Sequence, residues 1–188
     1  MQVLSFSKTP SKRRSLAARF ARGRTGSTAV EFAMIALPFL ALIMGIIEIS
    51  MIYLVSTTLE NATADVARKV RTGELQTSGT TQNKTTFIAA ICSELTWLSS
   101  CTTNLYVDVN KFSSFSTVTQ TSPTKNGQVD QTQLNFVLGG PGDIVMVRAF
   151  YQWTLFTPVL DGMAATLNGG STLITSTAAF RNEPYGAS

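Results

Sequence analysis

Apolar residues dominate one long stretch near the start of the chain. Residues 32–55 form a run of 24 positions in which Glu48 is the one charged residue. About 20 apolar residues in a helix cross the roughly 30 Å hydrocarbon core of a bilayer. Lipid offers no hydrogen bonds, so a crossing segment satisfies its backbone groups internally, as a helix does. The pattern therefore predicts a transmembrane helix over about residues 32–55. The run is longer than the 7–15-residue core of an ordinary secretory signal.

The helical pattern continues beyond this run. Apolar residues recur at three- and four-residue spacing with charged residues between them, which is typical of an amphipathic helix; they are Leu59, Ala62, Val66 and Val70. Gly73 then offers a helix stop. We expect one helix over about residues 27–72, roughly 70 Å long, of which less than half is needed to cross a bilayer. The surplus would project from the membrane as a stalk.

The remaining residues, 73–188, alternate between polar loops and short patterned segments. Residues 74–84 are rich in Thr, Ser and Gln and predict a hinge, whereas residues 87–98 have helical periodicity, with Thr85 or Thr86 as a possible cap. Strands are predicted at 105–112, 143–153 and 172–181, a long polar excursion at 113–142 and a short helix around 163–167. The fold class is therefore α+β: a long N-terminal helix leading into a small domain with one helix on an antiparallel, three-stranded sheet.

Charge is distributed unevenly. Of the 15 Lys and Arg residues, seven precede residue 27, where there is no acidic residue, and the rest of the chain has a net charge of −3. Basic residues beside a membrane helix stay on the cytoplasmic side. We therefore interpret residues 1–26 as a cytoplasmic leader that sets topology, and not as a nucleic-acid-binding tail. The domain after the helix is then exported.

Two cysteines, Cys92 and Cys101, both follow the apolar run and so lie on the exported side. An oxidising compartment favours a disulfide between them; two buried free thiols are the alternative. The sequence has no histidine, which removes the usual general base and the commonest transition-metal ligand. We find no catalytic motif and expect no enzyme activity, no cofactor and no metal site.

Glu48 is an ionisable residue inside the apolar run. Such residues are costly in lipid and usually face a partner. We expect a basic or polar group in another helix of a membrane assembly, the alternative being a position near the exported leaflet where the carboxyl is partly hydrated or protonated. Four aromatic residues offer a possible binding surface, although packing in the core is the more common use; they are Trp97, Phe150, Tyr151 and Trp153.

Three strings of residues carry a family resemblance. The segment from Thr25, which includes Gly26, Glu31 and Phe32 before the apolar helix, resembles the TadE family of tight-adherence pilus proteins, as do residues 139–148 and 180–185. The resemblance does not separate TadE from the related TadF and TadG. It implies a pseudopilin of a tight-adherence (Flp, type IVb-like) system, inserted once in the bacterial inner membrane with its C-terminal domain in the periplasm. The resemblance leaves open whether the processed chain associates with a filament.

The resemblance also implies a processing site. A prepilin peptidase would cut between Gly26 and Ser27 on the cytoplasmic side, and Glu31 with Phe32 would serve in recognition and assembly. Glycine lets catalytic groups approach the backbone closely, and in pilins the carboxylate pairs with the amino terminus of a neighbouring subunit. Alternatively, Gly26 only ends a flexible tail, and Glu31 favours the first turns of the helix through the helix dipole.

The expected partners are membrane lipid, the prepilin peptidase, and the other pseudopilins, pilins and inner-membrane platform proteins of the same system. Two other functions remain open. One is an uncleaved, membrane-anchored periplasmic scaffold, and the other is an exported ligand-binding or adhesive protein. A membrane enzyme is disfavoured by the residue inventory.

Overall fold

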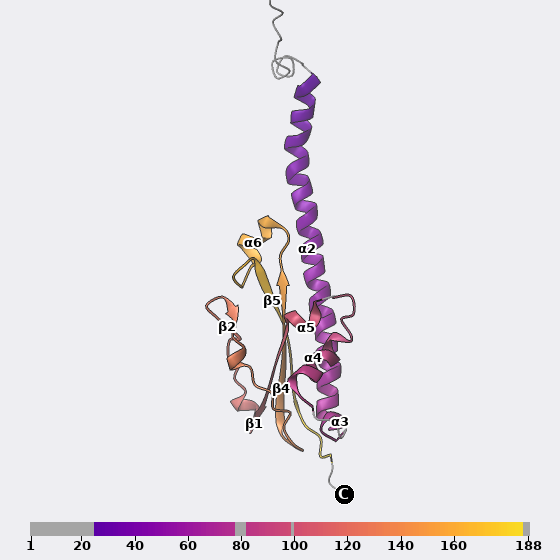
Figure 1. Cartoon of the computed structure of the whole chain (residues 1–188), viewed down its shortest axis with the longest axis vertical. Coiled ribbons are helices and arrows are strands. Elements are labelled where there is room, and N and C mark those ends of the chain that lie inside the picture. The colour runs from indigo at the N-terminus through magenta and orange to yellow at the C-terminus, as the bar shows by residue number, and fades with distance from the viewer. Residues whose placement is uncertain (1–24, 78–81, 99, 186–188) are drawn as a thin grey trace, which may run out of the picture. The chain divides into compact units, whose positions relative to one another are not determined.

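The computed structural model of the chain describes residues 25–77, 82–98 and 100–185. Figure 1 shows the helices and strands in chain order. The helices are α2 (Thr25–Arg71), α3 (Glu74–Thr77), α4 (Lys84–Cys92), α5 (Cys101–Asn104) and α6 (Pro158–Ala164), with 3-10 turns at Phe115–Thr117 and Gln131–Gln133. The strands are β1 (Leu105–Phe112), β2 (Thr124–Lys125), β3 (Gln128–Val129), β4 (Ile144–Thr154) and β5 (Ser171–Arg181).

The chain divides into two compact units, one ending at Ile43 and the other starting at Met44, which we call the head unit. In the first unit, the described residues form the N-terminal part of α2. Its large apolar side chains face outward: Phe32 is 74% exposed and Leu37 72% exposed. Only 6% of the most apolar 18-residue window of the helix is buried. A core helix of a soluble protein would be mostly buried, so this helix is one that fits a single-pass membrane anchor.

The head unit is built on a three-stranded sheet in the order β1-β4-β5. Both pairings are antiparallel, with Val109 opposite Val147 and Val147 opposite Ala178. β4 is central and its first eight residues are buried, which is why its sequence is apolar on both faces and not only on alternate positions. The predicted α+β class and the antiparallel sheet are confirmed.

The hydrophobic core lies between one face of this sheet and the helices α2 and α4. Alternate residues of β4 supply one side of it, among them Val147 and Tyr151. The C-terminal part of α2 supplies the other through residues spaced three or four apart; they are Val55, Leu59, Ala62, Val66 and Val70. Full burial of such side chains stabilises a fold by about 1.5–3 kcal/mol each. The amphipathic part of α2 is therefore a core element of the head unit.

The part of the polar excursion that contains β2 lies against the opposite face of the sheet, as Figure 1 shows, whereas Phe136, near the end of the excursion, bridges to Val109 of β1 and contacts the Phe87 ring of α4.

The excursion contains the hairpin of β2 and β3. In its turn, the φ angle is 54° at Asn126 and 72° at Gly127. Two positive φ values define the type I′ turn that Asn-Gly favours. Asn168 holds this turn in place, because its side-chain amide donates to the carbonyl oxygen of Asn126 at 2.7 Å.

Two predicted helices differ from the observed ones. α4 starts after Asn83, whose side chain accepts from the Thr86 backbone N–H in a capping box, so Asn83 is the cap and not Thr85 or Thr86. It ends at Cys92, where turns replace the expected helix up to residue 98. The short helix α6 covers Pro158–Ala164 and not 163–167, because Pro158 at its first position presets the helical φ angle.

Candidate functional site

The expected processing site lies in the first turn of α2. Gly26 and Ser27 follow Thr25, the first residue of the helix. A Cβ atom built on Gly26 has nothing within 4 Å. Packing among the described residues therefore does not require glycine at position 26.

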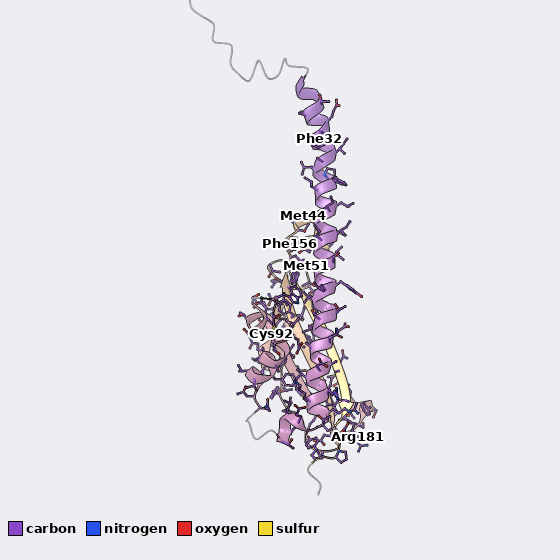
Figure 2. The ribbon with its side chains drawn as sticks, turned by 90° about the vertical axis from the view of Figure 1, so that its right-hand side faces the viewer. Phe32, Met44, Met51, Cys92, Phe156 and Arg181 are labelled. Carbon is purple, nitrogen blue, oxygen red and sulfur yellow. A yellow bond between two sulfur atoms is a disulfide. The ribbon has the colours of Figure 1, made fainter. Side chains whose placement is uncertain are left out.

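Glu31 and Phe32 lie on the same helix, about one and a half turns further on. Both side chains are exposed, and Phe32 is labelled near the start of α2 in Figure 2. The structure thus places the four expected processing residues on one helical segment, on which the side chains of Glu31 and Phe32 are exposed. This arrangement is compatible with recognition by another protein.

Glu48 has partners within its own chain. Its side chain is fully buried. Oε1 accepts a hydrogen bond from the backbone N–H of Phe156 at 2.7 Å, and Oε2 accepts one from the backbone N–H of Thr157 at 2.9 Å. Hydrogen bonds to a charged acceptor are stronger than neutral ones. We expected a partner in another membrane helix; the structure compensates the carboxylate without one.

The two donors stand immediately before α6, with Thr157 at its N-cap and Pro158 at its first position. We did not identify Phe156 and Thr157 as partners of Glu48 from the sequence. The pair Thr157-Pro158 is a recognisable helix start and would have located α6. However, α6 lies more than 100 residues from Glu48 along the chain, so no local sequence pattern predicts the contact between them.

Cys92 and Cys101 form a disulfide, as predicted, with their Cα atoms 5.7 Å apart. It joins the end of α4 to the start of α5, across the turns that replace the expected helix. Cys101 is buried in the core beside Leu105, the first residue of β1. The disulfide therefore fixes α4 to the edge strand of the sheet.

A buried ion pair, not anticipated from the sequence, lies between β1 and β4. Arg148 donates from Nε and Nη2 to Asp108 Oδ2 at 3.0 and 2.5 Å, and both side chains are at most 4% exposed. The pair also holds the excursion: Asp108 Oδ1 accepts from the backbone N–H of Asn135, and Arg148 Nη1 donates to the carbonyl oxygen of Thr121. With these bonds the pair is a structural clamp between the sheet and the excursion.

Asp143 organises the entry to β4. Its Oδ2 accepts from the backbone N–H of Gly140 at 2.8 Å and lies 3.6 Å from Lys111 Nζ. The hydrogen bond from Gly140 and, to a smaller extent, the Lys111 charge lower the pKa of Asp143 below its usual value. The Tyr185 hydroxyl lies 3.5 Å from the carbonyl oxygen of Gly139, and burial raises the pKa of this tyrosine above its usual value. Both side chains therefore contact the backbone of the turn at 139–142.

The aromatic residues considered as a binding surface are divided between core and surface. Phe150 and Tyr151 are almost fully buried, whereas Trp97 is 42% exposed. Trp97, Tyr151 and Trp153 line an open hollow of about 340 Å³. No group of three or more His, Cys, Asp or Glu side chains that could hold a metal ion occurs in the described ranges 25–77, 82–98 and 100–185.

Among the comparisons with known proteins, one match covers an N-terminal segment of the chain. Residues 26–68 match a family model described as TadE-like protein. No curated protein and no solved structure matches the chain significantly. The match starts at Gly26, runs along α2 and ends three residues before Arg71, so it does not extend into the sheet of the head unit. Over residues 26–68 this chain is therefore similar to the TadE-like family, the family that its sequence resembles.

Proposed function

We propose that this protein is a minor pseudopilin that acts, without catalysis, in the assembly of a tight-adherence (Tad/Flp) pilus. The TadE-like segment associates the chain with this kind of pilus. In the proposal, α2 inserts once in the bacterial inner membrane, the basic leader stays in the cytoplasm, and the head unit lies in the periplasm. The seven cations before residue 27 support this orientation.

The observation that carries the proposal is the exposure of the apolar half of α2. Phe32, Ile35 and Leu37 are each more than 70% exposed, although water would favour their burial by about 1.5–3 kcal/mol each. Soluble monomers rarely expose a contiguous apolar surface of this kind, and where they do it marks a membrane or a protein contact. Both surroundings are available to a pseudopilin, first the bilayer and then the neighbouring helices of an assembly.

The residues in hydrocarbon would start earlier than the run 32–55 alone indicates. Glu48 and Val55 are fully buried in the head unit, so lipid does not need to surround them. Twenty residues, which are about enough to cross the bilayer, span 28–47 when counted from the start of the candidate span at Thr28. We place the crossing there, directly after Gly26 and Ser27, with Glu31 near its cytoplasmic edge.

The first step in the proposed role is cleavage between Gly26 and Ser27 by a prepilin peptidase. The site lies at the start of the described part of α2, and a Cβ atom built on Gly26 has nothing within 4 Å. After cleavage Ser27 would carry the new amino group, and Glu31 would lie four residues further along the mature chain. Contact of Glu31 with the amino terminus of a neighbouring pilin or pseudopilin would then set the register of assembly.

The test is the intact mass of the protein after co-expression with a prepilin peptidase of a tight-adherence system. We expect the chain to lose residues 1–26. Gly26→Ala should abolish the loss, because the added methyl meets nothing in the structure and can interfere only with the peptidase. Gly45→Ala is the matched control, since it places a methyl in equally open space on the same helix and should be cleaved normally.

A native protein that retains residues 1–26 in the presence of active peptidase would favour the uncleaved scaffold instead. A ligand-binding or adhesive protein remains the second alternative, and the open hollow at Trp97 and Trp153 is the feature that favours it. Fractionation distinguishes these roles: a pseudopilin should be lost from its assembly, and piliation should fail, when Gly26→Ala replaces the normal protein.

A further inference from the structure

An apolar surface lies at the end of the head unit where β4 ends and β5 begins. Phe156 is 49% exposed, Met163 is 81% exposed, and Pro158 between them is also exposed. We call these three residues the α6 tip. Leu160 on the same helix is half-buried. A soluble domain gains nothing from placing large apolar side chains on a short helix that projects from its sheet.

The α6 tip is tied to one level of α2. The two hydrogen bonds from Phe156 and Thr157 to the Glu48 carboxylate fix the start of α6 beside that residue. Figure 2 shows Phe156 near Met44 and Met51 of α2, with Arg181 at the opposite end of the head unit. Around Glu48, the outward-facing residues of α2 are also apolar and exposed; they are Ile46, Ile47, Ile49, Tyr53 and Leu54. The α6 tip thus continues the apolar surface of α2.

Charge is scarce at this end of the head unit. Between residues 155 and 170 the one charged residue is Asp161, and between 44 and 59 it is Glu48. Glu48 is buried, whereas Asp161 is exposed with its carboxylate beside Gly170, where a Cβ atom would be 2.8 Å from Oδ1. Exposed ion pairs occur at the opposite end, between Arg71 and Glu183 and between Lys111 and Asp143. This separation of apolar from charged ends is what a membrane surface favours.

The level of the α6 tip agrees with the point where α2 would leave the hydrocarbon. About 20 residues of helix counted from Thr28 end at Ile47, and the next residue, Glu48, holds the α6 tip. Tyr53, which is 71% exposed, follows within two turns, and tyrosine is enriched at the membrane–water interface.

We propose that the α6 tip inserts into the interfacial region of the bilayer, as a second membrane contact beside α2. This inference rests on the membrane anchoring proposed above. Phe156 and Met163 would enter the acyl boundary of the periplasmic leaflet. The two hydrogen bonds to the Glu48 carboxylate would hold the start of α6 at this depth.

The test uses the full-length chain with Met163→Cys, labelled with an environment-sensitive fluorophore. The native cysteines are joined in a disulfide, so without reductant only the new thiol reacts. The protein is reconstituted at low density in vesicles of phosphatidylethanolamine and phosphatidylglycerol that contain lipids spin-labelled near the headgroup. Gly162→Cys is a second reporter, because a Cβ there has open space. Ser113→Cys is the control, since Ser113 is exposed and follows β1 at the opposite end of the sheet.

We expect the spin-labelled lipid to quench the labels at 162 and 163 about threefold or more strongly than the label at 113. Equal quenching at the three positions, in protein that still floats with the vesicles, would overturn the α6 contact and leave the anchor intact. Protein that does not float with the vesicles would remove both proposals. A fall in quenching by the spin-labelled lipid as the protein-to-lipid ratio rises would assign the α6 tip to a contact with a second copy of the chain. That result would also overturn the inference. Unchanged near-ultraviolet circular dichroism verifies that each variant is folded.

Discussion

The Oε2 atom of Glu48 accepts a hydrogen bond from the backbone N–H of Thr157 at 2.9 Å, across 109 residues of sequence. This bond and its neighbour from Phe156 join the one acidic residue of the apolar run to the loop before α6. The carboxylate is the sole charged group of residues 32–55, and its position inside the head unit explains how the sequence tolerates it there.

Loss of the Glu48 carboxylate should weaken the head unit. Glu48→Ala leaves two backbone N–H groups without their acceptors, and a buried unsatisfied donor costs about 1–3 kcal/mol. We expect the free energy of unfolding to fall by about 2–4 kcal/mol, and by less in Glu48→Gln, which keeps one acceptor oxygen. Thermal unfolding of the full chain in detergent, followed by near-ultraviolet circular dichroism, measures the difference.

Glu60→Ala is the matched control for this prediction, because Glu60 lies on the same helix and is exposed. It should change stability by no more than about 0.5 kcal/mol. If Glu48→Ala were as stable as Glu60→Ala, the two hydrogen bonds between Glu48 and the start of α6 would contribute nothing to the free energy of unfolding.

The Asp108–Arg148 pair should be costly to break on one side alone. Arg148→Met leaves the Asp108 carboxylate buried without its cation, and the removal of one partner of a buried pair typically costs about 3–5 kcal/mol. The double variant Asp108→Asn, Arg148→Met removes the uncompensated charge and should recover part of this loss. Because Arg148 also donates to Thr121, the single variant should expose residues 113–143 to proteases.

Lys111→Met serves as the comparison for the buried pair, since the Lys111–Asp143 pair is exposed and should contribute little to stability. A double variant less stable than Arg148→Met would show that charge compensation is not the main role of the pair. Urea titrations of the three proteins give the free energies.

Gly73 should not tolerate a side chain. Its φ angle is +76°, and a Cβ atom would lie 2.1 Å from Cγ of Tyr185, whose ring covers this turn after α2. Gly73→Ala should therefore lower the melting temperature, and adding Tyr185→Ala should not restore it fully, because the backbone strain remains. Gly162→Ala, in open space on α6, should be neutral or stabilising by up to about 1 kcal/mol. Equal melting temperatures for Gly73→Ala and Gly162→Ala would contradict this account.

Asp143 should make stability depend on pH in the acidic range. Its pKa is lowered in the folded protein, chiefly by the hydrogen bond from Gly140. The stabilisation is therefore complete above the unfolded-state pKa of about 3.9 and is lost as the pH falls through the lower folded-state pKa. Asp143→Asn keeps an acceptor but does not titrate, so the stability difference between parent and variant should shrink as the pH falls below about 4. A difference that stays constant from neutral pH to pH 2 would refute the role of this carboxylate.

Elements with strong periodicity could be predicted from the sequence. α2 was expected over 27–72 and covers Thr25–Arg71, because an apolar run followed by spaced apolar residues specifies a helix with little competition. β4 is expected over 143–153 and covers Ile144–Thr154, because most of its residues are apolar or β-branched and follow the glycine-rich turn at 139–142. The disulfide could be predicted because both cysteines follow the apolar run, on the expected exported side, and are nine residues apart.

The elements that depend on long-range contacts could not be predicted. α4 ends at Cys92 because the disulfide and the following turns replace its last predicted turns, although the periodicity continues to Leu98. The partners of Glu48 lie more than 100 residues away, and a carboxylate that finds backbone donors looks the same in sequence as one that awaits another protein. The ion pair of Asp108 with Arg148 depends on the register of β1 with β4, which sequence patterns leave undefined.

One helix serves both as anchor and as core. Residues before Ile43 and the core residues Val55 to Val70 belong to the same α2, with no linker between them. A force applied to the anchor would therefore be transmitted along the helix axis straight into the packing of α2 against the sheet, as shear, with no slack segment to absorb it. In the proposed role of a subunit that is pulled from a membrane, this load would act on the core packing of the head unit.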